Sequence, residues 1–305
     1  MMDKILIIDS HNNIYRACVN FGPPPEHDIC SNCTDDRHRP YTHCKCKSPW
    51  NEEERYCYGD RYGFVCNFFR NLRPIVEDFS PDKIFMVFEG HPQFRYDLYA
   101  DYKANRIIKT ASKQESRDKF IKTMDIIIPL LQYMPITMAS AANYEADDTI
   151  GSLCENMRDE DITVLSSDSD FTQLLQRGYK QIRIYNPIKK EFVVPPTWHY
   201  VTWKCLNGDK SDNIPSLLKP KKAIETASDP EKLRKFMEVE EQRASFQVNR
   251  QLIDFANVPE EEIVLTEGIR QFDLLKQHFA DMKFESIIND TSWERFTKTF
   301  DCVKY

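Results

Sequence analysis

Hydrophobic residues along this chain occur either in short unbroken runs or at the spacing of one helix face. The runs predict buried strands at "KILIID" (4–9), "KIFMVFE" (83–89), "PITMA" (135–139) and "ITVLSS" (162–167). Helical spacing predicts helices over residues 11–20, 61–78 and 92–134, and a further helix from Tyr144 or Glu145. Strands that alternate with helices indicate an α/β fold, with a central, mostly parallel sheet and helices on both faces.

Two stretches depart from this pattern. From Gly22 to about Gly59 the periodicity disappears, and cysteine, proline and histidine dominate the composition. Beyond residue 195 the chain is predicted to be mostly helical. We therefore expect two domains: an α/β core over residues 1–195, which contains the insert at 22–59 and a helical region at 92–134, and a helical domain over residues 196–305.

Composition is consistent with a soluble globular protein. The chain has 305 residues with 41% hydrophobic content, enough to bury a large core. The apolar run of "MMDKILIIDSHN" is broken at Asp9, so we expect no signal peptide, and no apolar stretch reaches the ~18 residues of a membrane span. Ten cysteines are then expected to be reduced thiols in a cytoplasmic protein, and we expect no membrane partner and a monomer.

Charge is unevenly distributed. The formal net charge of -7 argues weakly against a nucleic-acid partner. Two segments nevertheless carry an excess of basic residues: residues 103–122 hold seven Lys/Arg against two Asp/Glu, a net of +5, and residues 204–222 hold five lysines against two aspartates, a net of +3. An acidic protein with two basic segments remains compatible with phosphate binding.

Acidic residues follow the predicted strands. Asp9, Glu89 and Asp168 each stand at or just after the end of an apolar run, and Asp170 lies two residues further on. In open α/β sheets the carboxyl ends of the strands share one edge, where ligands bind, so these acids are expected to meet there. Taken singly, an aspartate after a strand is more often a turn residue or a helix N-cap.

A second acidic cluster, "YEADD" (144–148), stands at a predicted helix start. Glu145 and Asp148 are three residues apart and share a face, and Asp147 lies beside them. By itself such a cluster is usually explained by the helix dipole, which favours acids at the N-terminus. If all seven acids converge without basic partners, divalent cations are needed to neutralise them. Mg²⁺ prefers oxygen ligands and bridges to phosphate, and two such ions promote phosphodiester cleavage.

The order of these motifs resembles a known family. Asp9 after a strand, "YEADD", "SSDSDFTQLL" and "NGDKSDNIP" occur in the same order in the 5′-nucleases, the flap endonucleases and 5′→3′ exonucleases of phages, bacteria and eukaryotes. The resemblance covers roughly residues 1–260, apart from the insert. It is strongest to the ribonuclease H of T-even phages, which is similar in length and in the segments "NGDKSDN" (207–213) and "LIDF" (252–255).

The resemblance implies two Mg²⁺ ions, for which Mn²⁺ can substitute. The first would be served by Asp9, Glu89, Glu145, Asp147 and Asp168, with Asp148 at its edge, and the second by Asp170, Asp209 and Asp212. Asp209 and Asp212 are three apart and are expected to project from one helical turn. The family usually has aspartate where this chain has Glu89, so a longer side chain is expected to retain but alter metal binding.

A basic and aromatic segment, "FRYDLYADYKANR" (94–106), follows the second strand. If it is one helix, a single face carries Arg95, Tyr99, Tyr102, Lys103 and Arg106, which suits a single nucleic-acid strand. The resemblance implies that Lys103 and Arg106, with Tyr102 beside them, act on the scissile phosphate and that residues 107–122 form a helical arch. The alternative is a solvated amphipathic helix whose tyrosines pack.

Duplex binding in the family uses a glycine-rich hairpin within a helix–three-turn–helix. Here that segment reads "SLLKPKKAIETA" (216–227) and has no glycine. Lys219, Lys221 and Lys222, together with Lys210, are expected to contact phosphates instead. The helical domain is thus expected to bind duplex.

The insert has paired cysteines. Cys30 and Cys33, then Cys44 and Cys46, have spacings that resemble a zinc knuckle pair, with His38, His43 or Cys57 as substitute ligands. Structural Zn²⁺ is one interpretation, and unrelated surface thiols are the other.

These observations predict a magnesium-dependent 5′→3′ exonuclease and flap endonuclease that removes RNA primers or 5′ flaps during replication. Its expected substrates are DNA and RNA–DNA hybrids with a 5′ end or flap, and its expected partners are single-strand-binding protein and replisome components. A PIN-type RNA endonuclease and a nucleic-acid binder with impaired catalysis are the alternatives.

Overall fold

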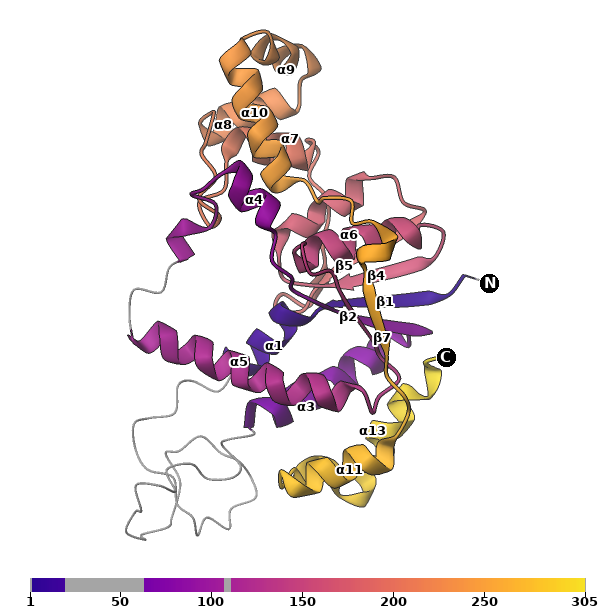
Figure 1. Ribbon diagram of the computed structural model, residues 1–305. Coiled ribbons are helices and arrows are strands. Elements are labelled where there is room, and N and C mark those ends of the chain that lie inside the picture. Colours follow the sequence, from indigo (N-terminus) through magenta and orange to yellow (C-terminus); the bar gives the residue numbers. More distant parts are fainter. Residues whose placement is uncertain (1, 20–62, 107–110, 305) are drawn as a thin grey trace. The chain divides into compact units, whose positions relative to one another are not determined.

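The computed structural model describes residues 2–19, 63–106 and 111–304. Its central feature is a sheet with the strand order β6-β5-β4-β1-β2-β3-β7 (Figure 1). The strands are β1 (Lys4–Asp9), β2 (Lys83–Phe88), β3 (Thr137–Ser140), β4 (Asp161–Leu165), β5 (Gln181–Asn186), β6 (Glu191–Phe192) and β7 (Val264–Glu267). Strands β1, β4 and β5 pair in parallel, and β6 is antiparallel to β5. The predicted α/β fold with a mostly parallel sheet is confirmed.

The central strands are apolar because both of their faces are covered. In β1 and β2 every residue after the first lysine is buried, including Asp9 at the end of β1. Strand β4 lies against β1 with Ile7 opposite Val164, and both side chains are fully buried. Continuous apolar runs of this kind are typical of parallel strands with helices on either face.

Contacts divide the chain into two compact units. The first comprises Met1–Asp9, Met86–Lys109 and Ala139–Leu265, and the second comprises Ser10–Phe85, Thr110–Met138 and Thr266–Tyr305. The helices of the first unit are α4 (Gln93–Leu98), η3 (Ala104–Arg106), α6 (Ala146–Asn156), η4 (Ser169–Gln176), α7 (Tyr200–Asn207), α8 (Pro220–Ala227), α9 (Pro230–Met237), α10 (Glu240–Ile253) and η5 (Glu260–Glu262). All of the predicted site residues that the structure describes lie in this first unit.

Helices α7, α8 and α10 of the first unit pack around their own hydrophobic core. Cys205, Leu206, Ala223 and Phe246 are among its buried members. The buried amide of Asn249 on α10 donates to the carbonyl oxygens of Cys205 (2.8 Å) and Pro215 (2.9 Å), which ties α10 to α7 and to the connection that follows it. This core fixes the segment that carries Asp209 and Asp212.

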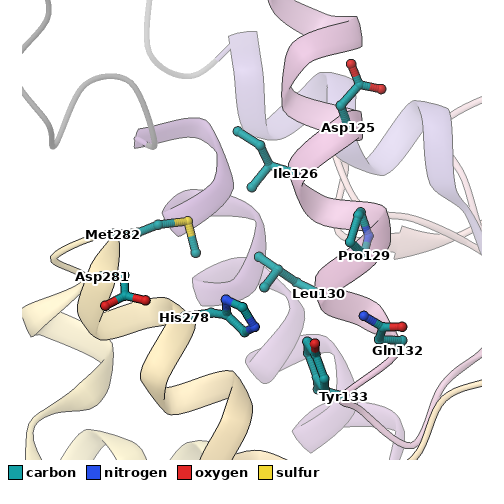
Figure 2. A pocket seen from close by; sticks show the side chains of 9 residues that line it. All are labelled: Asp125, Ile126, Pro129, Leu130, Gln132, Tyr133, His278, Asp281 and Met282. Atoms are coloured by element: carbon teal, nitrogen blue, oxygen red, sulfur yellow. The ribbon is translucent and has the colours of Figure 1, made fainter.

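The second unit is built from α1 (Ser10–Val19), α3 (Gly63–Phe79), α5 (Ala111–Leu131), α11 (Phe272–Asp281), α12 (Glu285–Ile288), α13 (Asp290–Thr299) and η6 (Phe300–Cys302). Phe69 on α3 contacts Phe279 on α11, with ring centroids 4.9 Å apart. A cavity of about 340 Å³ lies between α5 and α11, where His278 stacks on Tyr133 (Figure 2). None of the predicted site residues lines this cavity.

Several predicted boundaries need correction. The strand expected at 135–139 is β3, at 137–140, and the strand expected at 162–167 ends at Leu165. Strands β5, β6 and β7 were not predicted, and because β7 lies beyond residue 195 that region is mostly but not entirely helical. Strand β5 alternates Ile182 and Ile184 with polar residues, a signal that was available, whereas every residue of β7 is exposed. Among the described residues, no helix is long and apolar enough to cross a membrane.

Candidate metal centre

The ends of β1 and β4 are joined through Ser166. Its hydroxyl donates to Asp9 Oδ2 (2.8 Å) and accepts from the backbone N–H of Asp168 (3.0 Å). Asp168 in turn is the N-cap of η4 and accepts the N–H of Asp170 at 2.9 Å. Asp9 is only 6% exposed. The chain thus places a buried acid and two more accessible ones at neighbouring strand ends, as the strand pattern predicted.

The end of β2 is held against the start of α6. Glu89 Oε2 accepts the backbone N–H of Ala146 at 2.8 Å, and the Gly90 N–H donates to the carbonyl oxygen of Tyr144 at 3.0 Å. A Cβ at Gly90 would lie 2.0 Å from the carbonyl oxygen of Ala141, so only glycine permits this approach. Glu89 is therefore fixed beside the acids of α6 by backbone geometry.

Helix α6 begins where the sequence predicted. Glu145 is its N-cap, and Glu145 and Asp148 form a capping box in which Asp148 Oδ2 accepts the Glu145 N–H at 3.1 Å. Asp147 stands between them in the first turn, where the helix dipole favours negative charge. Two of the three acids of "EADD" therefore contribute to the start of the helix.

Asp9, Glu89, Asp147 and Asp168, here called the first group, act on one another electrostatically. Burial raises the pKa of Asp147 well above its ordinary value, and the charges of Asp168, Asp9 and Glu89 raise it further. Displacement of water by the surrounding protein raises the pKa of Glu89 to about 7, and Glu145 and Asp9 add to the rise. The structure therefore brings the first group together, with a mutual repulsion that a cation would relieve.

The donors of the first group suit a hard cation. All four are carboxylates, and neither cysteine nor histidine takes part, which favours Mg²⁺ or Mn²⁺ over zinc. Within the described ranges no three acidic, histidine or cysteine side chains converge closely enough to hold one ion directly as they lie. Mg²⁺ keeps several of its waters when bound, so contact through water is the mode these positions fit.

The remaining acids have basic partners. Arg95 forms a bidentate pair with Asp148, with nitrogen–oxygen distances of 2.6 and 2.7 Å, and Asp148 also accepts the Ala256 N–H at 2.8 Å. Arg95 is 2% exposed and Asp148 is fully buried. This geometry corrects two expectations: Asp148 has no oxygen left for a metal, and Arg95 does not face nucleic acid. The pair instead fixes α4 to α6.

Glu145 is also neutralised from α4 and the loop after it. Lys103 pairs with its Oε1, and the Tyr102 hydroxyl (3.0 Å) and Arg95 (3.2 Å) donate to its Oε2. The predicted single helix over 94–106 does not form, because α4 ends at Leu98 and Tyr99 is extended.

The end of α4 at Leu98 determines what Tyr99 and Tyr102 contact. Tyr102 is 2% exposed and belongs to the hydrophobic core of α7, α8 and α10, against which Tyr99 also packs. The expectation that these rings stack on bases is therefore corrected, and the packing alternative holds. Lys103, at a φ of 55°, donates its N–H to the carbonyl oxygen of Asp212 at 2.9 Å.

Asp170, Asp209 and Asp212, here called the second group, share their charge with three bases. Lys204 on α7 pairs with Asp170 and, at 2.8 Å, with Asp209. Arg106 pairs with Asp212, and Lys103 lies 3.9 Å from it. Burial would raise the pKa of Asp209, but its hydrogen bond from Lys204 and the charge of that ammonium lower the pKa to about 2. For Asp170, burial outweighs the same ammonium and its pKa is raised.

Asp209 and Asp212 lie on a turn, not on the helical turn that their spacing suggested. Asp209 and Ile214 exchange two backbone hydrogen bonds of 3.0 and 2.8 Å, which close the segment. Gly208 has a φ of 71°, and a Cβ there would lie 2.6 Å from the Ile214 carbonyl oxygen. The turn directs Asp209 toward Lys204 and leaves Ser211 to donate to Asp209 at 2.7 Å.

Residues 4–198 match the family model described as the 5′-3′ exonuclease N-terminal, resolvase-like domain. The chain belongs to the 5′-nuclease family. It is 33% identical over 162 residues to DNA polymerase I of Streptococcus pneumoniae, covering 48% of this chain and 18% of that protein. It is 32% identical over 169 residues to a 5′-3′ exonuclease of Bacillus subtilis, covering 50% of this chain and 53% of that one. The chain thus spans only about a fifth to a half of these relatives.

The fold is also similar to that of a solved 5′-nuclease. The flap endonuclease of bacteriophage T5, in a complex with DNA and metal ions, superposes with a TM-score of 0.55 at 14% identity, covering 97% of each chain. At this identity the likeness shows a common fold, and it agrees with the α/β architecture and the helical part that follows it.

The four lysines expected to contact phosphates in this 5′-nuclease are exposed. Lys219, Lys221 and Lys222 surround the N-terminus of α8, and Lys210 lies on the turn between Asp209 and Asp212. No acidic side chain in the described part of the chain forms an ion pair with any of the four. The connection before α8 is fixed without glycine, because the N–H groups of Leu217 and Leu218 both donate to the Leu206 carbonyl oxygen at 2.9 Å.

Three residues of the site were not predicted. Ser166 lies within a quoted motif, yet nothing in its sequence context indicated that it joins two strands. Lys204 was counted only as part of a basic segment, and Tyr200, whose hydroxyl donates to Asp170 at 3.0 Å, was not singled out. Tyr200 and Lys204 are four residues apart and therefore lie on one face of α7. The sequence alone does not connect that face to Asp170.

Some expectations lie outside the described residues. The proposed zinc ligands Cys30, Cys33, Cys44 and Cys46 are among them, as is the whole insert at 22–59. Residues 107–110 of the expected arch also lie outside, and α5 begins at Ala111.

Proposed function

We propose that this chain is a divalent-metal-dependent 5′→3′ exonuclease and flap endonuclease that hydrolyses phosphodiesters with two metal ions. The observation that carries the proposal is the first group: four carboxylates, at the end of β1, directly after β2, in the first turn of α6 and after β4, whose charges and burial raise the pKa of Asp147 and of Glu89. The family to which the chain belongs supports the reaction class. Mg²⁺, when bound, would neutralise these acids, polarise a phosphate and acidify the attacking water.

The chain's own residues would position the phosphate. Lys103 and Arg106 face the acids from the loop after α4, where Glu145 and Asp212 hold them. A scissile phosphate offers both bases a stronger charge-assisted contact than a carboxylate that they share with other donors. They would therefore orient the phosphate and offset its charge. Tyr102 would act as a positioning residue through Glu145.

The duplex next to the cleaved end would lie against the start of α8. Lys219, Lys221 and Lys222 stand exposed at the N-cap and in the first turn of that helix, where the backbone also favours anions. The proposed substrates are DNA and RNA–DNA hybrids with a 5′ end or flap, as in primer removal. Single-strand-binding protein and replisome components are the proposed partners, on the family resemblance alone.

A 5′-flap duplex incubated with and without Mg²⁺ tests the proposal. We expect cleavage at the flap junction and from the 5′ end in Mg²⁺ or Mn²⁺, and none in a chelator. Binding of the flap without cleavage in either ion would refute the proposal and favour a structure-specific binder. Preferential cutting of single-stranded RNA would favour a PIN-type endonuclease.

A further inference from the structure

A lysine ammonium lies between two acids of the second group. Lys204 Nζ pairs with Asp170 Oδ1 and lies 2.8 Å from Asp209 Oδ2. The lysine side chain is 9% exposed, and those of Asp170 and Asp209 are 18% and 15% exposed. The charge that these acids need is thus supplied by the chain itself.

The surroundings of Lys204 hold its ammonium in place. Tyr200, one turn earlier on α7, donates its hydroxyl to the same Asp170 oxygen at 3.0 Å. The other oxygen of Asp209 accepts the backbone N–H and the hydroxyl of Ser211, each at 2.7 Å. A buried lysine is stable only when its charge is compensated, and here two carboxylates compensate it.

Three acids of the first group, Glu89, Asp147 and Asp168, differ from the second group in this respect. Among the described residues, no lysine or arginine forms an ion pair with Glu89, Asp147 or Asp168. The two groups therefore differ in what they offer a divalent cation: the first presents carboxylates that repel one another, and the second presents carboxylates that an ammonium already bridges. A divalent cation cannot share that bridge, because the two positive charges would repel at close range.

We infer that Lys204 is a resident counter-cation that keeps the second group closed to divalent ions in the free protein. The free protein then holds one ion, at the first group, and a second ion enters only when the ammonium withdraws. A phosphodiester is the other anion this site meets, so substrate binding is the event that draws Lys204 away. The inference deepens the proposed function and rests on it for the identity of the metal sites.

The experiment counts Mn²⁺ ions bound by the free protein, by calorimetric titration and by the electron paramagnetic resonance of unbound Mn²⁺. The wild type is expected to bind one ion. Lys204→Met, which keeps an unbranched side chain one atom shorter and loses the charge, is expected to bind two, the second at least about tenfold more tightly than any second ion of the wild type. Lys204→Arg, which keeps the charge, is the matched control and should bind one.

A further variant tests whether the added ion binds at the second group. Asp209→Asn in the Lys204→Met background is expected to return the count to one. Two equal ions in the wild type, or a single ion in a folded Lys204→Met variant, would overturn the inference. Should Lys204→Met not fold, Lys204→Gln provides the same comparison, and the wild-type count stands by itself.

The count does not depend on nuclease activity, because no nucleic acid is present. A chain that binds one ion, gains a second with Lys204→Met and cleaves no flap would refute the proposed function and leave the inference standing. A chain that cleaves flaps and holds two equal ions in the free state would support the proposed function and refute the inference.

Discussion

The two groups of acids lie in the same unit of the protein and differ in the charges beside them. Glu89 and Asp147 of the first group have raised pKa values, because burial and neighbouring acids oppose their ionisation. Asp209 of the second group has its pKa lowered to about 2, although it is also partly buried, because Lys204 bonds to it. Lys204 makes this difference for Asp209, whereas for Asp170 burial outweighs the same ammonium and the pKa stays raised.

This comparison separates metal candidates from structural acids. An acid that is fully paired, such as Asp148 with Arg95, stabilises the fold. Its oxygens already accept hydrogen bonds from a cation, so a metal ion gains little by binding them. An acid that only meets other acids is held there at a cost in folding free energy, and such costs are typical of functional sites. The sequence counted Asp147 and Asp148 among the same converging acids, with Asp148 at the edge of the site, and the structure divides them.

The largest expected effect is on catalysis. Asp147→Asn removes one carboxylate of the first group, and we expect flap cleavage in Mg²⁺ to fall at least about a thousandfold, or about 4 kcal/mol of transition-state stabilisation. Flap binding should change little, because Asp147 does not contact the exposed lysines. Single-turnover cleavage and fluorescence anisotropy in a chelator measure the two effects.

The same substitution should stabilise the metal-free protein. Removing a carboxylate whose pKa is raised by its neighbours relieves repulsion, so the thermal midpoint in a chelator should rise. Asp125→Asn, an exposed acid of the second unit, serves as the control and should change neither property. Full activity in Asp147→Asn would remove this acid from the metal centre.

The next effect is on stability. Arg95→Met leaves Asp148 buried without its cation, and we expect a loss of about 3–5 kcal/mol in the free energy of unfolding, measured by urea denaturation. The double variant Arg95→Met with Asp148→Asn removes both charges and should recover part of the loss. If the single variant unfolds like the wild type, Asp148 is available to other cations and the division into paired and unpaired acids fails.

Much of the fold was predictable because its signals are local. Unbroken apolar runs marked β1, β2 and β4, and the acids at a helix start marked α6 to within a residue or two. These patterns depend on neighbours within one turn or one strand. The same reasoning predicted that Asp9, Glu89 and Asp168 share an edge, because parallel strands end at the same side of a sheet.

The basic partners were not predictable, because they come from distant parts of the sequence. Arg95 lies 53 residues from Asp148, and Lys204 lies 34 from Asp170. Helical spacing over 94–106 was misleading for a related reason: burial of Tyr102 in the core of α7, α8 and α10 outweighs the helical preference of the segment. Tertiary contacts, which residue spacing does not encode, determine both the basic partners of the acids and the end of the helix at Leu98.

A smaller effect concerns pH. The pKa of Glu89 is raised from 4.5 to about 7, so the folded protein keeps a proton that the unfolded chain has released across that window. Stability of the metal-free protein should therefore fall as pH rises from about 4.5 to about 7. Glu89→Gln should remove this part of the fall. Thermal midpoints in a chelator at about pH 5 and about pH 8 measure it. A shift of a few degrees at most is expected, because solvent still reaches part of the Glu89 side chain although its carboxyl lies against the other acids.

Saturating Mn²⁺ provides the control for this pH dependence. If the ion binds at the first group, the wild type should lose the Glu89 contribution to the pH dependence, because the bound charge favours the ionised carboxylate. An identical pH dependence in the wild type and in Glu89→Gln, with and without the ion, would show that Glu89 does not belong to the first group.

The smallest expected effect is on duplex binding and concerns the basic residues. Lys103, Arg106 and Lys204 are held by acids, whereas Lys221 and Lys222 are exposed at the start of α8. If the exposed lysines bind duplex phosphates, Lys221→Ala with Lys222→Ala should weaken duplex binding by about tenfold and reduce the salt dependence of log K by about 2, because about two counterions fewer are released.

Fluorescence anisotropy of a labelled flap duplex over a range of salt concentrations measures this slope. Lys235→Ala, an exposed lysine on α9, is the matched control and should leave the slope unchanged. The number of Mn²⁺ ions bound should stay at the wild-type value in both variants, because neither lysine touches an acid of the two groups. A double variant that loses a metal ion but keeps its salt slope would mean that the exposed bases serve the metal centre and that nucleic acid is bound elsewhere.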